Sequence, residues 1–516
     1  MTRLRLFTDD DSAPLFRSIH DAPWWDGAGI EISKDVADTA IFCVSQPTEW
    51  NRVAERFERV SVPTVVVGPG LASIAKPSQE HDIRIRPRGL GLAEDVVIRD
   101  RVIDLSRASG GVLATANIAF TDLPVMRWDA DRCLAGLGVG LEPQTWHDQE
   151  FLRLVHRLLH RISQPVEQSA IRVGLLGYGA IGHEHAGAIA ATDGLDLAMV
   201  CDLSDDRRAV AESYTPGVAT TDDPSALRDS ADVDLVIVST PPNTHGQWAL
   251  DLIEAGKHVV LEKPMALTTA ECDAAIDAAA RADRTLVVYQ NRRFDPDFRA
   301  IAHAIEVGDL GEVFHLEAFV GTYQHPCNYW HSDADVSGGA LFDWGSHIVD
   351  QILQLMPGEI ASVTARNHKR MWHDVTNADH ARMTLHYADG REATFIYSDL
   401  AAALKPRWYL AGTKGGLIGD WRRERVVARS PIGTLAEDLL APADSPPQLW
   451  LHSDDGRVAQ VPGRPAPVGE FHRQLVDFIR EGLPMTVTAD HSRRVVAMLE
   501  AAELSAARDG APVVPA

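Results

Sequence analysis

Cysteine and basic side chains are scarce in this chain of 516 residues. The five cysteines are scattered, odd in number and lack any Cys-x-x-Cys pair, so they fit reduced thiols better than a disulfide framework. Lysine and arginine number 49 against 73 aspartates and glutamates, which gives a net charge of −24. This excess of negative charge argues against a nucleic-acid partner, because nucleic acids are bound by basic surfaces.

Long apolar runs are also missing. No segment approaches the length of a membrane-spanning helix, and the first residues, MTRLRLFTDDD, become acidic where a signal peptide would need an apolar core. Together with the reduced thiols, these absences predict a soluble, cytoplasmic protein without a membrane partner. The chain exceeds one ordinary hydrophobic core, so we expect about two to four domains.

What the chain does contain is a dinucleotide-binding fingerprint. The apolar strand Val173–Leu176 runs directly into Gly177-x-Gly179-x-x-Gly182, and an alanine-rich helical pattern follows over His183–Thr192. The first glycine allows a tight turn, the second lets the backbone approach a pyrophosphate, and the third lets the helix pack on the strand. The N-terminus of that helix attracts the phosphates.

The next apolar strand, Leu197–Cys201, ends on Asp202, twenty residues after the last glycine of the fingerprint. A carboxylate at this place accepts the ribose hydroxyls and repels a 2′-phosphate, which favours NAD over NADP. Arg207 and Arg208 lie close enough in sequence to weaken this preference, so NADP stays an alternative.

Polar loops follow the later strands. The continuous apolar run Val233–Val238 is typical of a strand buried on both faces, and it ends in the loop Ser239–His245. The strand His258–Leu261 precedes Glu262-Lys263-Pro264, and the strand Thr285–Tyr289 precedes an arginine pair. Because ligands bind beyond the C-terminal ends of parallel strands, we expect the first loop beside the nicotinamide half of the cofactor.

Several motifs occur in the order and spacing of one oxidoreductase family. They are GYGAIGHEH, STPPNTH, HVVLEKPMALT, YQNRRFDP, GDLGEV and GGALFDWGSHIVD, with the closing pattern EFHRQLVDFIREGLP…AMLEAAELSAARDGAPV. In these motifs the chain resembles the Gfo/Idh/MocA oxidoreductases, the family of glucose–fructose oxidoreductase and inositol dehydrogenase, over about residues 171–516. The resemblance implies a Rossmann domain at 171–292 and an α+β domain at 293–516 with a large open, mostly antiparallel sheet.

The resemblance also implies the ligands. It predicts NAD or NADP as the cofactor, a sugar, cyclitol or related polyol as the small-molecule substrate, and a homo-oligomer formed through the C-terminal sheet. The residues predicted to bind the cofactor are Gly177, Tyr178, Gly179, Ala180, Ile181, Gly182, Asp202, Thr240, Pro242, Asn243, His245, Glu262 and Lys263.

The fingerprint begins far into the chain, so residues 1–165 are expected to form a separate domain. Short apolar strands alternate there with helical or loop stretches and end in an amphipathic helix over Asp148–Ile162, which predicts a small parallel, flavodoxin-like α/β domain. The element order and the ending GLGVGLEPQTWHDQEFLRLVHRLLHRI resemble the trehalose-utilisation (ThuA-like) and glutamine-amidotransferase-like domains. The glycine-flanked cysteine nucleophile of true amidotransferases has no counterpart, so we expect a non-catalytic accessory domain. The predicted strands are Leu4–Phe7, Thr39–Val44, Thr64–Val67, Val96–Ile98 and Cys133–Val139.

Three further segments organise the rest of the chain. The polar stretch Ser163–Ala170 is predicted to be a linker, and the proline-rich region Pro431–Pro467 is predicted to form surface loops within the last domain. The segments Glu470–Gly482 and Asp490–Arg508 are predicted to be helices.

A polar stripe follows Gly338-Gly339. Asp343, His347 and Asp350 fall at i, i+4 and i+7, so one face of a helix presents all three. A solvated helix face or a structural Asp–His hydrogen bond would give the same spacing. Beside a cofactor, however, a buried polar stripe is costly unless it has a role, and the family resemblance favours an active site.

Oxidation of an alcohol requires a base for the hydroxyl proton, and histidine titrates near neutrality. We therefore predict that His347 is the base and that Asp343 binds a substrate hydroxyl and orients the site. Lys263, held in the Glu262-Lys263-Pro264 turn, would donate a hydrogen bond to the reacting oxygen and stabilise alkoxide charge.

Other polar residues are weaker candidates. Besides Asp343, the predicted substrate-binding residues are Arg293, Tyr323 and Trp330. The resemblance implies substrate contacts just before the active helix, where His325 and His331 also lie. These two histidines lack a third ligand at metal-site spacing, so we predict no metal, and we favour structural roles for them over substrate contacts. The remaining candidates are His183 and His185, expected to cap or pack the first helix, and Arg292, for which a ligand contact and a surface ion pair are equally expected.

Three functions fit these observations. The first is an NAD(P)-dependent oxidoreductase acting on a secondary alcohol of a sugar, cyclitol or related polyol. The second is a redox-neutral enzyme that oxidises a sugar carbon transiently to cleave a glycoside. The third is a non-enzymatic dinucleotide or sugar sensor, against which the intact Lys263, Asp343 and His347 argue.

Overall fold

The computed structural model describes residues 170–327, 329–421, 447–466, 469–481 and 485–516, and elsewhere the strands and helical stretches named below together with residue 139 and the short helix η2 (Pro143–His147). The chain divides into two compact units. The first comprises Met1–Ala170, Thr192–Gly194 and Pro467–Met485, and the second comprises Ile171–Ala191, Leu195–Ala466 and Thr486–Ala516.

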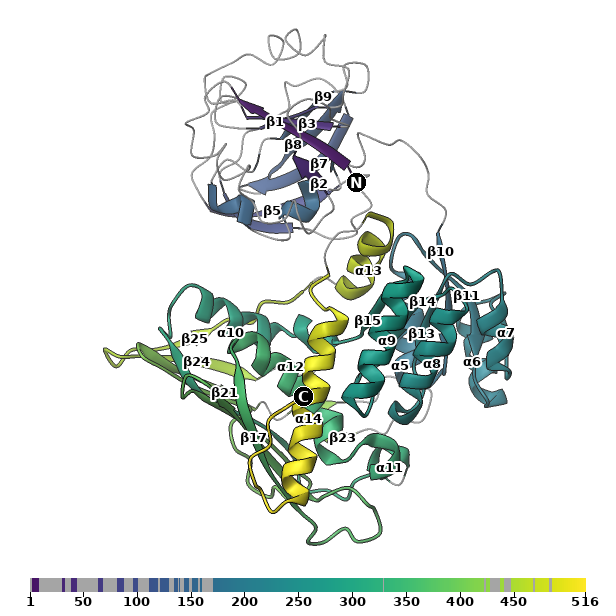
Figure 1. The fold of residues 1–516 in the computed structure, drawn as a ribbon. Coiled ribbons are helices and arrows are strands. Elements are labelled where there is room, and N and C mark those ends of the chain that lie inside the picture. The colour runs from purple at the N-terminus through teal and green to yellow at the C-terminus, as the bar shows by residue number, and fades with distance from the viewer. Residues whose placement is uncertain are drawn as a thin grey trace. The chain divides into compact units, whose positions relative to one another are not determined.

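The first unit contains a nine-stranded sheet with the order β2-β1-β3-β4-β9-β8-β7-β5-β6 (Figure 1). Strands β2, β1, β3, β4 and β9 pair in parallel, in the order of a flavodoxin-like sheet, whereas the strands from β9 to β6 pair antiparallel. The strands are β1 (Thr2–Thr8), β2 (Ile30–Ile32), β3 (Thr39–Cys43), β4 (Thr64–Val67), β5 (His81–Pro87), β6 (Val96–Asp100), β7 (Gly111–Ile118), β8 (Thr121–Asp129) and β9 (Leu134–Leu137).

The sequence predicted strands at β1, β3, β4, β6 and β9 but missed β2, β5, β7 and β8. The expectation of a wholly parallel sheet is wrong for the strands from β9 to β6, which pair antiparallel. The expected linker Ser163–Ala170 lies outside the described residues except for its last residue. The resemblance to ThuA-like domains and the absence of chemistry in this segment stay predictions.

Helix α13 (Glu470–Glu481) belongs to the first unit, although its sequence position lies within the expected 293–516 domain. The helical residues 151–155 and 158–159 fall in the predicted Asp148–Ile162 helix, whose described apolar side chains are buried. The guanidinium of Arg153 lies 3.3 Å from the fully buried carboxylate of Asp477. This ion pair joins α13 to a segment far away in sequence within the first unit.

A Rossmann sheet begins the second unit. Its order, β12-β11-β10-β13-β14-β15, is that of a six-stranded dinucleotide-binding fold, and every pair is parallel. The strands are β10 (Ile171–Leu176), β11 (Leu195–Cys201), β12 (Ala219–Thr221), β13 (Leu235–Val238), β14 (His258–Leu261) and β15 (Leu286–Val288). The intervening elements are α5 (Ala180–Ala190), α6 (Asp205–Tyr214), α7 (Pro224–Asp229), η3 (Pro242–Thr244), α8 (His245–Glu254) and α9 (Thr269–Ala282).

An eight-stranded mixed sheet follows, with the order β17-β18-β19-β16-β20-β21-β24-β25. Only β16 and β19 pair in parallel within it; its other pairs are antiparallel. The strands are β16 (Val313–Gly321), β17 (Ile360–His368), β18 (His380–Tyr387), β19 (Glu392–Ser398), β20 (Trp408–Gly412), β21 (Gly415–Asp420), β24 (Gln448–Ser453) and β25 (Val458–Val461). A separate two-stranded ribbon is formed by β22 (Glu424–Val426) and β23 (Glu437–Leu439).

Helices cover one face of this sheet. One hydrophobic core joins α10 (Pro296–Glu306), α12 (Ala340–Leu355) and α14 (Ala489–Ala507) to the strands, and α14 runs beside α12 (Figure 1). The shorter elements η4 (Asn291–Phe294), η5 (Trp330–Ser332) and α11 (Ala334–Ser337) lie between the longer ones in sequence.

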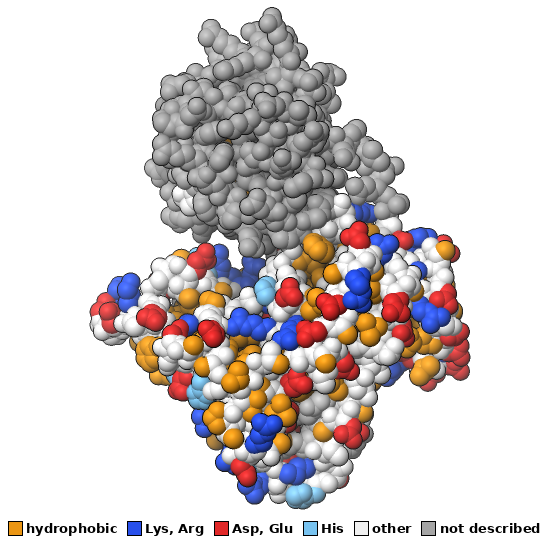
Figure 2. All heavy atoms as spheres, in the orientation of Figure 1, with side chains coloured by type: hydrophobic (Ala, Val, Ile, Leu, Met, Phe, Trp, Pro, Cys, Tyr) orange, Lys and Arg blue, Asp and Glu red, His pale blue; other side chains and the backbone are white. Residues whose placement is uncertain are grey.

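The expectation of loops over Pro431–Pro467 is wrong in part, because β24 and β25 complete the sheet there. Among the described residues, no helix combines the length and apolar character needed to cross a membrane. On the face shown in Figure 2, the described lysines and arginines are interspersed with acidic side chains.

Candidate active site

The three fingerprint glycines have three different surroundings. Gly177 has φ +94°, and a Cβ there would lie 2.7 Å from the carbonyl oxygen of Ser239. A Cβ on Gly182 would lie 2.5 Å from the carbonyl oxygen of Gly177. A Cβ on Gly179 would meet nothing within 4 Å. Packing therefore requires the first and third glycines, whereas the second borders open space where a phosphate group can approach.

The N-terminus of α5 faces this turn. Gly179 is its N-cap residue and supplies no side-chain cap, and the first turn contains no acidic side chain. The backbone donors at this end suit an anion. This arrangement fits the pyrophosphate of a dinucleotide, which the backbone of Gly177–Gly182 would hold. The side chain of Tyr178 points elsewhere: it is fully buried, and its hydroxyl lies 3.1 Å from Nδ1 of His183.

Asp202 lies directly after β11 and is fixed by backbone donors. The amide of Tyr178 donates to its Oδ2 at 2.7 Å, and the amide of Ser204 donates to its Oδ1 at 2.8 Å. Arg207 lies 3.5 Å from Oδ2, and Arg208 donates to the backbone oxygen of Asp202. Each carboxylate oxygen has a second lone pair, so the group can still accept ribose hydroxyls.

In the loop after β13, the residues predicted to bind the cofactor differ in exposure and in their contacts. Asn243 is exposed, Pro242 is buried, and the hydroxyl of Thr240 lies 2.7 Å from that of Thr244. His245, predicted to bind the cofactor, is fully buried, with Nδ1 and Nε2 each 2.8 Å from the carbonyl oxygens of Pro264 and Thr240. We correct the prediction that His245 binds the cofactor, because both of its ring nitrogens are used in contacts that join two loops.

The turn after β14 links the Rossmann sheet to α12. The ammonium of Lys263 donates to Oδ1 of Asp343 at 2.8 Å and to the backbone oxygen of Asp343 at 3.2 Å. Glu262 is buried, accepts from the amide of Lys263 at 3.1 Å and lies 3.0 Å from Nε2 of His185. His185 therefore packs α5 against this turn, and Pro264 follows Lys263 through a cis peptide bond.

Asp343 and His347 lie one turn apart on α12, as the spacing predicts. Burial alone would raise the pKa of Asp343, but the positive charge of Lys263, its hydrogen bond and the charge of Arg292 outweigh burial and hold that pKa below its usual value, and His331 adds to this effect when it is protonated. Asp343 is therefore an anion with its Oδ1 already engaged.

His347 is buried, and Nδ1 of its ring has no hydrogen-bond partner among the described residues. Burial, together with the positive charges of Lys263, Arg292 and Arg407, lowers the pKa of His347 well below its usual value. The ring is therefore neutral near pH 7 and can accept a proton.

Arg293 does not serve the substrate site, which corrects its predicted role. Its guanidinium forms a bidentate pair with Asp350, with Nε 2.7 Å from Oδ2 and Nη2 2.6 Å from Oδ1, and both side chains are buried. The neighbouring Arg292 lies over the ring of Trp344, 4.7 Å from its centre. Asp350 therefore anchors α12, and only Asp343 and His347 of the polar stripe remain available.

The segment Thr322–Asp333, here called the strap, precedes α11. Tyr323 is 55% exposed, and its hydroxyl donates to the sulfur of Met371, so the structure does not bring it to Asp343. The ring of Trp330 stacks on that of His331, with centres 3.6 Å apart. Nδ1 of His331 lies 3.9 Å from Oδ2 of Asp343. The sequence made His331 a weaker candidate for substrate contact and favoured a structural role, and in the structure its ring borders the candidate site.

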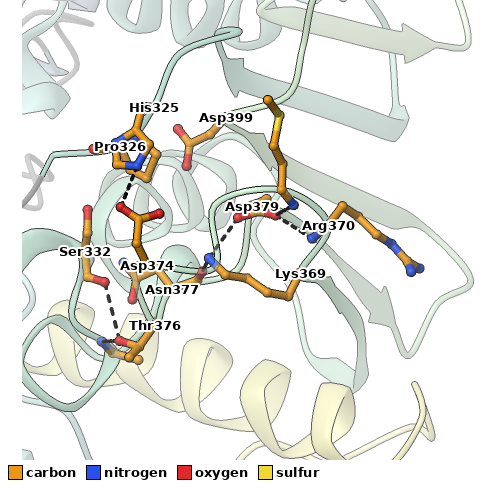
Figure 3. A network of polar contacts seen from close by, with 12 residues as sticks. His325, Pro326, Ser332, Lys369, Arg370, Asp374, Thr376, Asn377, Asp379 and Asp399 are labelled. Carbon is orange, nitrogen blue, oxygen red and sulfur yellow. Dashed lines mark hydrogen bonds and ion pairs between the residues drawn. The ribbon is translucent and has the colours of Figure 1, made fainter.

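A loop over residues 369–379 holds the strap (Figure 3). His325 lies 2.8 Å from Asp374, and the side chain of Asn377 donates to the backbone oxygen of His331 at 2.7 Å. Among the described residues, no cluster of three His, Cys, Asp or Glu side chains is placed to hold a metal ion.

The fold and site together define a nicotinamide-dinucleotide oxidoreductase. Residues 171–290 match the oxidoreductase family with an NAD-binding Rossmann fold, and residues 298–418 match the GFO/IDH/MocA C-terminal domain. The chain belongs to the Gfo/Idh/MocA family.

Relatives and solved structures support this assignment. The scyllo-inositol 2-dehydrogenase (NADP(+)) IolW of Bacillus subtilis (strain 168) is 29% identical over 341 residues, which cover 64% of this chain and 92% of that protein. Inositol 2-dehydrogenase of Rhizobium meliloti (strain 1021) is 31% identical over 258 residues, 49% of this chain and 76% of that protein. GenD2 from gentamicin A biosynthesis, solved in complex with NAD, has a TM-score of 0.55 at 26% identity, covering 67% of this chain and 96% of that chain. An NAD-binding protein from Listeria innocua has a TM-score of 0.58 at 26% identity, covering 67% and 97%.

The glycine geometry predicts that Gly179→Val weakens NAD binding by at least about tenfold while the melting temperature stays within about 2 °C, because the added methyls enter open space, not protein. Fluorescence titration with NADH and thermal unfolding measure the two effects. Gly182→Ala is the contrast, since its Cβ meets backbone and should lower the melting temperature. Unchanged NADH affinity in Gly179→Val would contradict the assigned pyrophosphate position.

Proposed function

We propose that this oxidoreductase transfers hydride between a secondary alcohol of a sugar, cyclitol or related polyol and a nicotinamide cofactor. The observation that carries the proposal is the Lys263–Asp343 pair, with its 2.8 Å contact, one helical turn from the neutral His347. The two relatives reported above are named inositol dehydrogenases, which supports a polyol substrate.

Lys263, His347 and Asp343 each have a separate role in the proposed reaction. The ammonium of Lys263 donates to the reacting oxygen and stabilises its negative charge as the proton leaves. His347 accepts that proton, since burial keeps its ring neutral. Asp343 holds Lys263 in place and accepts from a substrate hydroxyl through Oδ2. The bound nicotinamide ring supplies the hydride acceptor.

We propose NAD as the preferred cofactor. Asp202 offers its carboxylate to the ribose hydroxyls, and the two arginines near it, which would attract a 2′-phosphate if they were free, already have acidic partners. Arg207 pairs with Asp202, and Arg208 pairs with Asp205. IolW is named an NADP(+) enzyme, so this chain would differ from that relative.

The direct test is a panel of myo-inositol, scyllo-inositol, D-glucose and D-gluconate, each with NAD and with NADP. We expect at least one polyol to produce reduced cofactor in proportion to the ketone formed, faster with NAD than with NADP. An aryl glucoside added to the panel tests the alternatives: a redox-neutral glycosidase would cleave it without net reduced cofactor, and a sensor would bind without turnover. Either outcome would contradict the proposal.

Substitutions should separate chemistry from cofactor binding. Lys263→Met and His347→Asn are each expected to lower kcat by roughly 100-fold or more, since each removes a group that acts on the reacting hydroxyl. NADH affinity of the His347 variant should stay within about threefold, a change of under about 1 kcal/mol. Lys414→Met, which changes an exposed lysine, is the matched control. Turnover near that of the control in either variant would refute its role.

The acid side of the pH profile reports on His347. Only the neutral ring accepts a proton, so kcat/KM for alcohol oxidation should fall as the pH drops through the pKa of His347. Because burial lowers this pKa, the fall should be centred well below about pH 6.5, the ordinary value for histidine. A fall centred at or above that pH would assign the base to another group.

We also propose a cytoplasmic homo-oligomer assembled through the outer face of the eight-stranded sheet. Tyr409, Ile418 and Trp450 oppose one another across three adjacent strands, and Tyr409 is 43% exposed. A row of large apolar side chains on a sheet face suits burial against a second copy.

A further inference from the structure

Arg407 lies buried at one end of the eight-stranded sheet. It directly precedes β20, where its amide donates to the oxygen of Gly419 at 2.8 Å and its own oxygen accepts from the amide of Phe319 at 2.9 Å. Phe319 lies near the end of β16, which finishes at Gly321, and the strap follows. The side chain of Arg407 is fully buried. Arg407 therefore belongs to the end of the sheet that leads into the strap.

The guanidinium of Arg407 has no hydrogen bond within the described part of the chain. Its Nε, Nη1 and Nη2 all lack a partner there. The carboxylate oxygen Oδ2 of Asp297 lies 3.5 Å from Nε, but this oxygen accepts instead from the indole nitrogen of Trp408 at 2.9 Å. Burial lowers the pKa of Arg407, although the charge of Asp297 opposes this effect. A buried charge without hydrogen bonds is costly, which indicates a partner from outside the chain.

Two other arginines of this region have carboxylate partners of their own. Arg293 forms its bidentate pair with Asp350, and Arg292 donates to Asp295 at 3.2 Å. Arg407 differs from both, because its nearby carboxylate supplies charge but no hydrogen bond. The ligand that completes Arg407 is therefore an anion.

Two indole rings hold the guanidinium in place. Its central carbon lies 5.7 Å from the ring centre of Trp408 and 5.5 Å from that of Trp421. Contacts with aromatic rings position a guanidinium without using its N–H groups. Because the contact with Asp297 is at Nε, the edge formed by Nη1 and Nη2 is the part left for a ligand.

Other buried polar atoms without a hydrogen bond among the described residues come from the elements around the candidate site. They are Nδ1 of His347 and Oε1 of Gln351 on α12, Oδ1 of Asn291 on η4 and Oδ1 of Asp297 on α10. These elements pack together, since Gln351 donates to a backbone oxygen of η4 at 2.7 Å and α10 shares a hydrophobic core with α12. The charge of Arg407 helps to lower the pKa of His347, so the guanidinium lies near the predicted base. Unsatisfied atoms gathered in this way indicate a polar ligand.

We propose that Nη1 and Nη2 of Arg407 bind a carboxylate carried by the substrate. The substrate class is therefore a polyol acid, an aldonate or a uronate, and not a neutral sugar or cyclitol. The two parallel N–H groups of a guanidinium edge match the two oxygens of a carboxylate. This proposal rests on the proposed function and narrows its substrate to an anion.

Binding to the protein loaded with NADH tests the proposal without turnover. The ligands are D-gluconate and D-glucuronate, each compared by calorimetry with its neutral amide, D-gluconamide or D-glucuronamide. We expect at least one acid to bind about tenfold or more tightly than its amide, because hydrogen bonds to a charged group are the stronger ones. Equal affinity of acid and amide, or no binding of either acid, would overturn the proposal.

Substitution of Arg407 should remove the preference for the acid. In Arg407→Gln we expect acid and amide to differ by less than about twofold, with the amide unaffected, and Arg407→Lys should keep part of the preference because it keeps the charge. Lys405→Met is the matched control, since this neighbouring lysine is 45% exposed and pairs with Glu317. An equal loss for acid and amide in Arg407→Gln, or an unchanged preference, would show that Arg407 binds no carboxylate. NADH titration and thermal unfolding identify a folding defect, in which case Arg407→Lys and the unsubstituted protein decide.

Replacing NADH by NAD separates this proposal from the proposed function. Reduced cofactor formed from the acid that binds supports both. An acid that binds but is not oxidised, while a neutral polyol is, would overturn the substrate class and leave the proposed function intact. Tight binding of the acid without reduced cofactor from any compound would refute the proposed function but not the carboxylate site.

Discussion

The contact between Lys263 and Asp343 is the interaction on which the candidate site depends. It joins the end of β14 in the Rossmann sheet to α12, which packs on the eight-stranded sheet. The two residues are 80 positions apart in the sequence. The side chains are 16% and 33% exposed, so the pair is screened from water only in part. In the proposed mechanism this contact sets where the cofactor and the substrate meet, and the positive charge of Lys263 keeps Asp343 ionised.

The surroundings of this pair lower the pKa of both Asp343 and His347 on α12. The positive charges of Lys263 and Arg292 hold Asp343 in its anionic form. Burial, together with the same positive charges, disfavours a proton on His347. Perturbed pKa values of this kind cluster at functional sites.

Local sequence patterns were sufficient for the Rossmann sheet, the glycine turn and the spacing on α12, because each depends on neighbours within a few residues. They failed for side chains whose hydrogen-bond partners are far away in the sequence. The guanidinium of Arg293 is paired with Asp350, 57 residues away. The backbone of His331 is held by a hydrogen bond from Asn377, 46 residues away. His245, which follows β13, likewise contacts the carbonyl oxygen of Pro264, which follows the neighbouring strand β14. A polar residue near a motif therefore signals a site only after its long-range partners are known.

The most direct measurement of the central claim is isotope transfer. A polyol from the panel, deuterated at the carbon that is oxidised, is incubated with the protein and NAD, and the cofactor and the product are analysed by mass spectrometry. The account predicts that reduced cofactor accumulates, that it contains the deuterium, and that the product is the matching ketone. Deuterium that remains on the carbohydrate, or a product formed without reduced cofactor, would contradict it.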